Sequence, residues 1–170
     1  MHPQRQRIET YVAEHPGAHF SELSRELDLA TGQVQYHVRK LVRGDALARK
    51  RLYGRTHFYP PSYDEWQRSA LALLCRETAR EILFVLLEEG PAHPDDVADD
   101  VGIARATVEY HVDRLREQDL IDKEYGEGNR VTLSVSDPEA TADLLAAIEP
   151  SLPDRLIDRF VVLVDDLFAD

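Results

Sequence analysis

The most chemically informative part of this sequence is a run of basic and amide side chains at helical spacing. Between Thr31 and Arg43, residues such as Tyr36 and Arg39 recur every three or four positions, which places them on one face of an α-helix. Arginine and lysine can bind guanine or phosphate, and glutamine can pair with adenine, so this face suits a DNA groove. The helix residues expected to contact DNA are Thr31, Gln33, Gln35, Tyr36, Arg39, Lys40 and Arg43.

A second group of basic side chains follows in a segment that reads as a hairpin. We expect further DNA contacts there from Arg49, Lys50, Arg51 and Arg55. At the hairpin tip, Arg55 is placed to enter a minor groove, where narrow A·T tracts concentrate negative potential. Base edges are assigned to Gln33, Gln35 and Arg39. Phosphates are assigned mainly to Lys40, Arg43, Arg51 and Arg55.

The helical pattern occurs a second time in the sequence, with different charged residues. QVQYHVRKL, which starts at Gln33, aligns without a gap with TVEYHVDRL, which starts at Thr107. In the second copy, Asp113 and Glu117 replace the two outward arginines, and carboxylates aimed at a groove would repel its phosphates. We therefore expect the second copy to be a scaffold, an interaction surface or a regulatory half, and not a second reader with the same docking mode.

Each copy reads as three helices followed by a hairpin. In the first copy, Ser21 is expected to cap the second helix and Thr31 the third. Residues 46–52 and 56–59 read as two strands around a turn at 53–55. Three helices and a hairpin make a winged helix-turn-helix.

Local residue choices agree with this order of elements. Val34, Val38 and Leu41 form an apolar stripe opposite the basic face, so they should pack inward. Asp28 and Gly102 occupy the same place in the tight turn before the third helix of each copy, and both residue types tolerate a positive φ.

Both copies resemble the helix-turn-helix of ArsR-like winged-helix transcription regulators, in the stretches LSRELDLATGQVQYHVRKLVRGDAL and VADDVGIARATVEYHVDRLREQDLI. In that family a tyrosine-histidine pair often sits within the recognition helix. The overall arrangement is similar to tandem winged-helix regulators of haloarchaea. The resemblance implies a mainly α fold with small β-hairpin wings: two tandem winged helix-turn-helix domains plus C-terminal helices. Metal-sensing members carry paired cysteines, whereas this chain has only Cys75, so metal sensing by that route is not expected.

The domains are expected at 1–61 (the DNA-reading winged helix), 62–76 (a linker helix), 77–136 (the winged helix with an acidic recognition face) and 137–170 (C-terminal helices). The last helix has two apolar stripes, which is more than one packing surface needs. One stripe could serve a homodimer that reads inverted half-sites, and a purely intramolecular core is the alternative. The expected dimerisation residues are Leu156, Phe160, Val161, Val164, Leu167 and Phe168.

Charge is distributed unevenly along the chain. The formal net charge is -12, yet residues 1–62 hold ten Lys and Arg against six Asp and Glu. A small basic module therefore precedes a strongly acidic body, which keeps a nucleic-acid partner plausible. The acidic composition and the scarcity of lysine resemble proteins of salt-loving archaea, with an ordinary acidic protein from a GC-rich genome as the alternative.

Several classes of function are disfavoured by what the sequence lacks. The single cysteine excludes an intramolecular disulfide, and Cys75 is expected to pack in an apolar helix. His15 and His19 lack clustered partners for a metal site, and His37 and His111 are expected to be buried and satisfied by backbone carbonyls. We find no phosphate-binding loop, nucleophile elbow or metalloprotease motif, so neither enzymatic activity nor a cofactor is expected. Without a signal peptide or an apolar run that could cross a membrane, a cytoplasmic location is expected.

These observations predict a sequence-specific transcription regulator that binds double-stranded DNA through its N-terminal winged helix. The alternative is a tandem winged-helix adaptor that docks proteins in a chromosome or transcription assembly. The basic surface around Arg39 and Arg43 favours DNA. The sequence does not identify a small-molecule effector.

Overall fold

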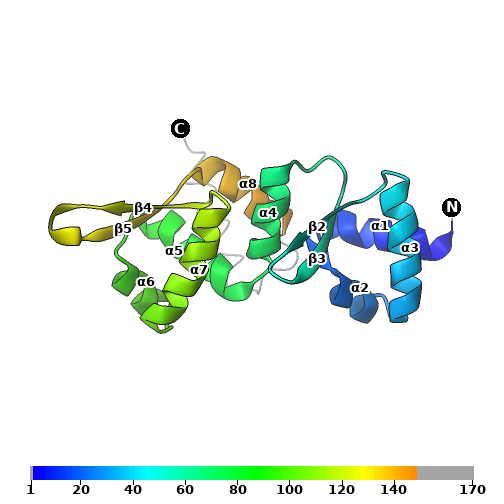
Figure 1. Ribbon diagram of the computed structural model, residues 1–170, viewed down its shortest axis with the longest axis horizontal. Helices are drawn as coiled ribbons and strands as arrows, with labels where there is room; N and C mark the ends of the chain where they lie inside the picture. Colours follow the sequence, from blue (N-terminus) through cyan, green and yellow to red (C-terminus); the bar gives the residue numbers. More distant parts are fainter. Residues whose placement is uncertain (1, 149–170) are drawn as a thin grey trace. The chain divides into compact units, whose positions relative to one another are not determined.

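The computed structural model describes residues 2–148, which form two compact units divided between Ala72 and Leu73. Each unit contains three helices followed by a β-hairpin, and the hairpins are labelled in Figure 1. The mainly α fold with small hairpin wings is thus confirmed. The stripes assigned to dimerisation, from Leu156 to Phe168, lie outside the described residues. No helix within residues 2–148 is long and apolar enough to cross a membrane.

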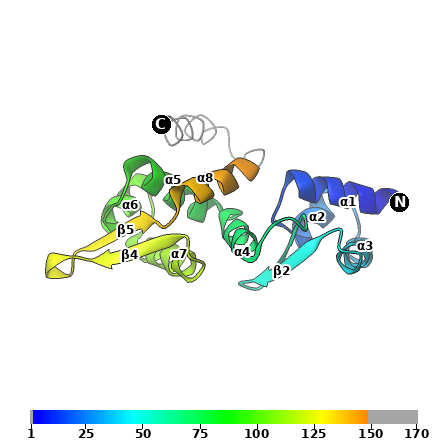
Figure 2. The ribbon, with the colours of Figure 1, turned by 90° about the horizontal axis from the view of Figure 1, so that it is seen from above.

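The helices of the first unit are α1 (Pro3–Glu14), α2 (Phe20–Glu26) and α3 (Thr31–Arg43). Helix α1 crosses α3 in Figure 1 and lies beside it in Figure 2, where α3 is seen nearly end-on. The predicted stripe of α3 is buried, with Val34, Val38 and Leu41 packed in the same core as Ile8 and Leu23. Burial of this stripe fixes which face of α3 remains open to solvent.

The wing of the first unit is made of β2 (Ala48–Leu52) and β3 (Arg55–Tyr59). A two-residue turn joins them, because Leu52 pairs with Arg55 and both Tyr53 and Gly54 have positive φ. The predicted three-residue turn was therefore one residue too long. A third strand, β1 (Ala18–His19), pairs with β3 and was not predicted. It ties the start of α2 to the wing.

Both predicted helix caps in the first unit are wrong. Helix α2 begins at Phe20, directly after β1, so its cap is His19 and Ser21 lies in the first turn. The Nδ1 atom of His19 accepts a hydrogen bond from the backbone N–H of Glu22 at 3.2 Å. Helix α3 is preceded by Ala30, whose backbone N–H donates to the Gln33 side chain at 3.1 Å. Thr31 is the first helical residue and does not cap.

The second unit repeats this plan with α5 (Glu77–Glu89), α6 (Pro94–Val101), α7 (Arg105–Glu117), β4 (Ile121–Tyr125) and β5 (Val131–Val135). A short 3-10 turn (Glu127–Asn129) joins the two strands, and helix α8 (Pro138–Ala147) follows. A single bridge between Ala92 and Leu133 stands where the first unit has β1. Helix α4 (Glu65–Leu74) contains the division between the units.

The tight turns before α3 and α7 have the predicted backbone conformation. Asp28 has a φ of 51° and Gly102 a φ of 79°, both in the left-handed region. Glycine reaches this region without a Cβ penalty, and aspartate is one of the side chains that tolerates it. The two turns therefore direct α3 and α7 in the same way from different residues.

Candidate nucleic-acid interface

The outward face of α3 is open along its length. Tyr36 is 55% exposed, and all seven helix residues predicted to contact DNA are exposed. The Nζ atom of Lys40 lies 5.2 Å from the centre of the Tyr36 ring. None of the salt bridges within residues 2–148 involves Arg39 or Arg43. The two guanidinium groups are thus available to an anion from outside.

The hairpin separates its basic side chains onto two faces, as strand alternation requires. Arg49 and Arg51 are exposed on one face of β2, and Lys50 points the other way. There the Nζ atom of Lys50 lies 2.6 Å from Glu65 Oε2. The hydrogen bond and charge of Lys50 lower the pKa of Glu65. Lys50 therefore already has a carboxylate partner, and within residues 2–148 the ion pairs include none of the other predicted hairpin contacts.

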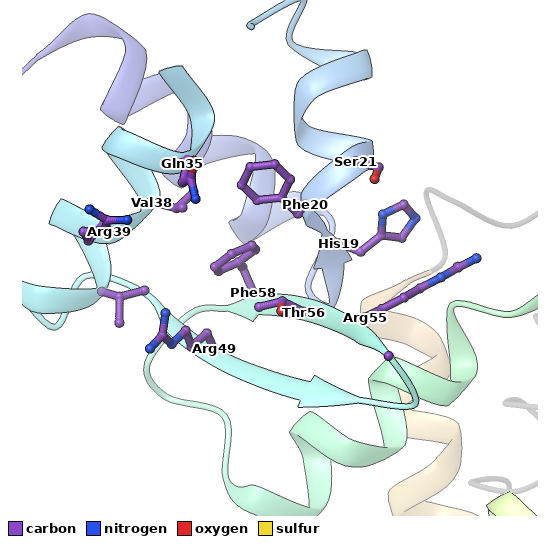
Figure 3. A pocket seen from close by; sticks show the side chains of 12 residues that line it. His19, Phe20, Ser21, Gln35, Val38, Arg39, Arg49, Arg55, Thr56 and Phe58 are labelled. Atoms are coloured by element: carbon purple, nitrogen blue, oxygen red, sulfur yellow. The ribbon is translucent and has the colours of Figure 1, made fainter. Parts of the chain in front are cut away.

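A groove of about 490 Å³ lies between the start of α2, α3 and the hairpin. Figure 3 shows Phe20 and Phe58 facing one another within it, with Arg39 and Arg49 toward one end and Arg55 toward the other. No carboxylate belongs to its twelve lining residues. Such a hollow, apolar inside and positive along its edges, can accept a sugar-phosphate backbone.

Sequence reasoning missed part of this lining. His19, Phe20, Ser21 and Thr56 also border the groove. Their position depends on β1, which pairs His19 with His57 and brings the start of α2 against the hairpin. A two-residue strand has too short a pattern to be read from sequence. The clue that was present is the alignment of His19 with His93 at the same place in both copies.

The corresponding surface of the second unit is occupied by internal ion pairs. Arg105 Nη1 lies 2.6 Å from Asp95 Oδ1, and Arg105 Nε lies 3.1 Å from Glu109 Oε1. Lys123 Nζ of β4 lies 3.2 Å from Glu109 Oε2. Burial opposes ionisation of Glu109, but the hydrogen bonds from Arg105 and Lys123 leave its pKa lowered overall. Arg114 lies over the ring of Tyr110 at 4.3 Å. Arg105, Arg114 and Lys123 thus have partners within the unit.

The groove between α7 and β4 is acidic. The charged residues that line it are Asp113, Arg116, Glu117, Asp119, Asp122, Lys123 and Glu124. Five carboxylates against two cations oppose the entry of a phosphate backbone. The contrast in charge predicted from the two aligned helices extends to the two wings.

The histidines provide no metal site within residues 2–148, where no group of three or more His, Cys, Asp and Glu side chains could hold an ion. His37 is buried, but its Nδ1 atom has no hydrogen-bond partner among the described residues. The expected backbone-carbonyl partner is therefore absent at this atom. The centre of the His2 ring lies 4.5 Å from the centre of the His37 ring.

Comparison with known proteins identifies a helix-turn-helix domain in each unit. A family model described as an N-terminal HTH domain matches residues 2–71, and one described as winged helix-turn-helix DNA-binding matches residues 76–122. An uncharacterised HTH-type transcriptional regulator of Methanocaldococcus jannaschii is 27% identical over 133 residues. That match covers 78% of this chain but only 33% of the relative's length. The chain therefore contains two tandem winged helix-turn-helix domains.

Three solved structures share part of this arrangement. Overoxidized AbfR bound to DNA has a TM-score of 0.43 and 16% identity, covering 80% of this chain and 90% of its own. ScpB from Mycobacterium tuberculosis has a TM-score of 0.34 and 15% identity, with coverages of 84% and 94%. The mRNA-binding domain of SelB from E. coli has a TM-score of 0.33 and 14% identity, with coverages of 81% and 100%. Structural similarities at these TM-scores do not indicate what this chain binds.

Proposed function

We propose that this chain is a transcription regulator that binds double-stranded DNA through α3 and the β2–β3 hairpin of its first unit. The observation that carries this proposal is the contrast between the recognition surfaces of the two units. In the first, Arg39, Arg49 and Arg55 border a hollow without carboxylates and form no ion pair within residues 2–148. Unpaired cations around a concave surface favour a polyanion.

The roles follow from position on the recognition helix and the wing. Gln35 and Arg39 of α3 line the groove and are assigned to base edges. Gln33 Oε1 already accepts one hydrogen bond, from the backbone N–H of Ala30, so its amide NH₂ is the group assigned to a base. The residues assigned to phosphates are Lys40, Arg43, Arg49, Arg51 and Arg55. Thr31, Tyr36 and Lys50 complete the proposed interface, with Lys50 contributing least because Glu65 holds it.

A charge exchange between the two units tests the proposal. Arg39→Asp with Arg43→Glu gives the first unit the residues of the second, and binding to a mixed-sequence DNA duplex is measured by fluorescence anisotropy over a salt series. We expect affinity to fall at least tenfold and the salt slope of log K to fall by about one unit, because Arg43 is assigned to a phosphate and Arg39 to a base edge. Asp113→Asn with Glu117→Gln is the matched control and should leave the affinity nearly unchanged. Unchanged affinity in the Arg39 and Arg43 variant contradicts the proposal.

We further propose that the chain forms a homodimer whose two first units bind inverted half-sites. Winged-helix dimers place recognition helices about one helical turn of DNA apart, or a multiple of it. The twin apolar stripes from Leu156 to Phe168 in the sequence support a partner of this kind. Light scattering of the full chain at micromolar concentration should give twice the monomer mass. A monomer mass throughout would rule the homodimer out and leave the DNA-binding surface standing.

The acidic second unit supports a protein partner as the competing function. Its recognition face exposes Tyr110 at 49% and Tyr125 at 64%, while Glu109 holds two nearby cations. Tyrosine is a residue type enriched at protein interfaces. An adaptor would retain a protein in stoichiometric yield in a pull-down, with no enriched DNA sequence. Enrichment of one DNA sequence with the full chain would favour the regulator.

The composition also supports a regulator that works at high salt, and the resemblance of its helix-turn-helix stretches implies an ArsR-like one. With 32 acidic residues against 20 basic ones, the chain as a whole repels DNA, and the first unit must supply the attraction. In molar salt the Debye length shrinks to about 3 Å, so hydrogen bonds must carry more of the binding.

A further inference from the structure

His19 lines the groove but has no role among the DNA contacts assigned above. Its ring is half-buried and lines the groove, and Figure 3 shows it beside Arg55 at the end away from Arg39. The same ring caps α2. A single imidazole therefore connects a helix terminus to the proposed DNA surface.

The cap determines which ring nitrogen of His19 carries the proton. Because Nδ1 accepts the N–H of Glu22 at 3.2 Å, its lone pair is occupied and cannot hold a proton. The neutral ring must then carry its proton on Nε2. Burial lowers the pKa of His19, the Glu22 carboxylate opposes this effect, and Arg55 and Arg25 add to it. At neutral pH the ring is thus uncharged. Its Nε2–H is a hydrogen-bond donor that the helix cap does not use, because the cap uses Nδ1.

We propose that His19 is a further DNA contact, donating its Nε2 hydrogen to a backbone phosphate oxygen that Arg55 also binds. This inference rests on the proposed function of the groove. A phosphate seated there would meet one charged and one neutral donor, and the cap would hold the neutral donor in place. The phosphate backbone would then enter the groove between the start of α2 and the hairpin tip.

The second unit contains the matched comparison. His93 caps α6 in the same manner, with Nδ1 accepting the N–H of Asp95 at 3.1 Å. Its ring, however, lies 3.5 Å from the carboxylate of Asp95, which also binds Arg105. A phosphate would be repelled at that position. Glu22 also acts on His19, but its carboxylate accepts the Tyr11 hydroxyl at 2.8 Å. The two histidines therefore share the capping role, and only the ring of His93 has a carboxylate against it among the ion pairs within residues 2–148.

The test replaces each histidine by serine, a preferred capping residue that keeps the helix terminus but is too short to reach a phosphate. Binding of the full chain to a mixed-sequence duplex is measured by anisotropy over a salt series. His19→Ser should weaken binding about tenfold, as expected for one hydrogen bond to a charged group. Its salt slope should stay unchanged, because a neutral donor displaces no cation, whereas Arg55→Gln should lower the slope by about one unit. His93→Ser should bind like the parent chain.

Long-range proton–nitrogen NMR of the ring provides a readout independent of the variant's stability. The parent chain should show the proton of His19 on Nε2, and this signal should shift when the duplex is added. A ring protonated on Nδ1, an unshifted signal, or a His19→Ser variant that binds like His93→Ser would each overturn the inference. If binding survives His19→Ser but is lost in the Arg39 and Arg43 variant, only this inference fails. If the Arg39 and Arg43 variant binds normally, the proposed function fails first.

Discussion

Glu109 Oε2 of α7 lies 3.2 Å from Lys123 Nζ of β4, so an ion pair ties the recognition helix of the second unit to its wing. In the aligned sequence, Gln35 stands at the place of Glu109 and Arg49 at the place of Lys123. The neutral amide of Gln35 cannot neutralise Arg49. Within residues 2–148, the carboxylate of Glu109 thus gives Lys123 an ion pair that Arg49 lacks.

Placing that carboxylate in the first unit should disable it. We predict that Gln35→Glu weakens binding to a mixed-sequence duplex about tenfold and lowers the salt slope by about one unit, because the new charge competes with phosphate for Arg49 and Arg39. Anisotropy over a salt series measures both quantities. Parent-like affinity would show that the arginines here do not need to be unpaired.

The reverse change in the second unit should not create a DNA site. Glu109→Gln releases Lys123, but Arg105 keeps its ion pair with Asp95. Asp113, Glu117 and other carboxylates still line the groove between α7 and β4. We therefore expect DNA affinity of the full chain to stay within about twofold of the parent. A gain of tenfold or more would mean that Glu109 alone blocks DNA binding, and that the surrounding acids do not matter.

The two faces of β2 should behave differently on DNA. Lys50 is held by Glu65 at 2.6 Å, whereas Arg51 is exposed on the opposite face. Arg51→Gln should lower the salt slope of binding by about one unit, and Lys50→Gln should leave it nearly unchanged. Equal effects of the two substitutions would show that Lys50 leaves Glu65 when DNA binds.

Stability of the first unit should decrease as the solution becomes acidic. Burial lowers the pKa of His37 from its ordinary value of 6.5, and the neighbouring His2, Arg5 and Lys40 charges lower it further. The unfolded chain therefore takes up a proton that the folded chain resists, so stability is full above about pH 6.5 and is lost as the pH falls below that value. Urea unfolding followed by the fluorescence of Trp66, the only tryptophan, should give a lower midpoint at about pH 5.5 than at about pH 8.

His37→Gln is the control for this pH dependence, because it removes the titrating ring from the same position. The difference in midpoint between the two pH values should become smaller in this variant, although His19, whose pKa is also lowered, still contributes. A variant with the full pH dependence of the parent would assign the effect to other groups.

The paired tight turns provide a prediction about backbone strain. Gly102 has a φ of 79°, and a Cβ added there would meet no atom within 4 Å, so only the backbone conformation resists a side chain. Gly102→Ala should destabilise the second unit by about 1 kcal/mol in thermal or urea unfolding. Asp28→Gly should change the first unit by less than about 0.5 kcal/mol, since relief of strain and added chain entropy oppose each other. A neutral Gly102→Ala would contradict the assigned conformation.

The helices and the reading face could be predicted because their signals repeat over many residues. The stripe formed by Val34, Val38 and Leu41 is buried as its spacing requires, and this burial leaves Arg39 exposed. The alternation of side chains along a strand also predicts that Lys50 of β2 faces away from Arg49 and Arg51.

The remaining features depend on contacts between distant residues. The pairing of β1 with β3 places Ala18 opposite Phe58, and no local sequence pattern predicts this pairing. Because this strand sets where α2 begins, the capping role of His19 and its place at the groove could not be read from the sequence. The ion pair between Glu109 and Lys123 likewise requires α7 and β4 to be packed together.

Hydrogen–deuterium exchange of the full chain, with and without a mixed-sequence duplex, shows whether DNA binds the first unit or the matching face of the second. We predict slower exchange in peptides from α3 and the β2–β3 hairpin when DNA is present, and no change in α7 or the β4–β5 hairpin. Protection confined to α7 and β4–β5, or equal protection of both faces, would mean that DNA does not bind the first unit alone.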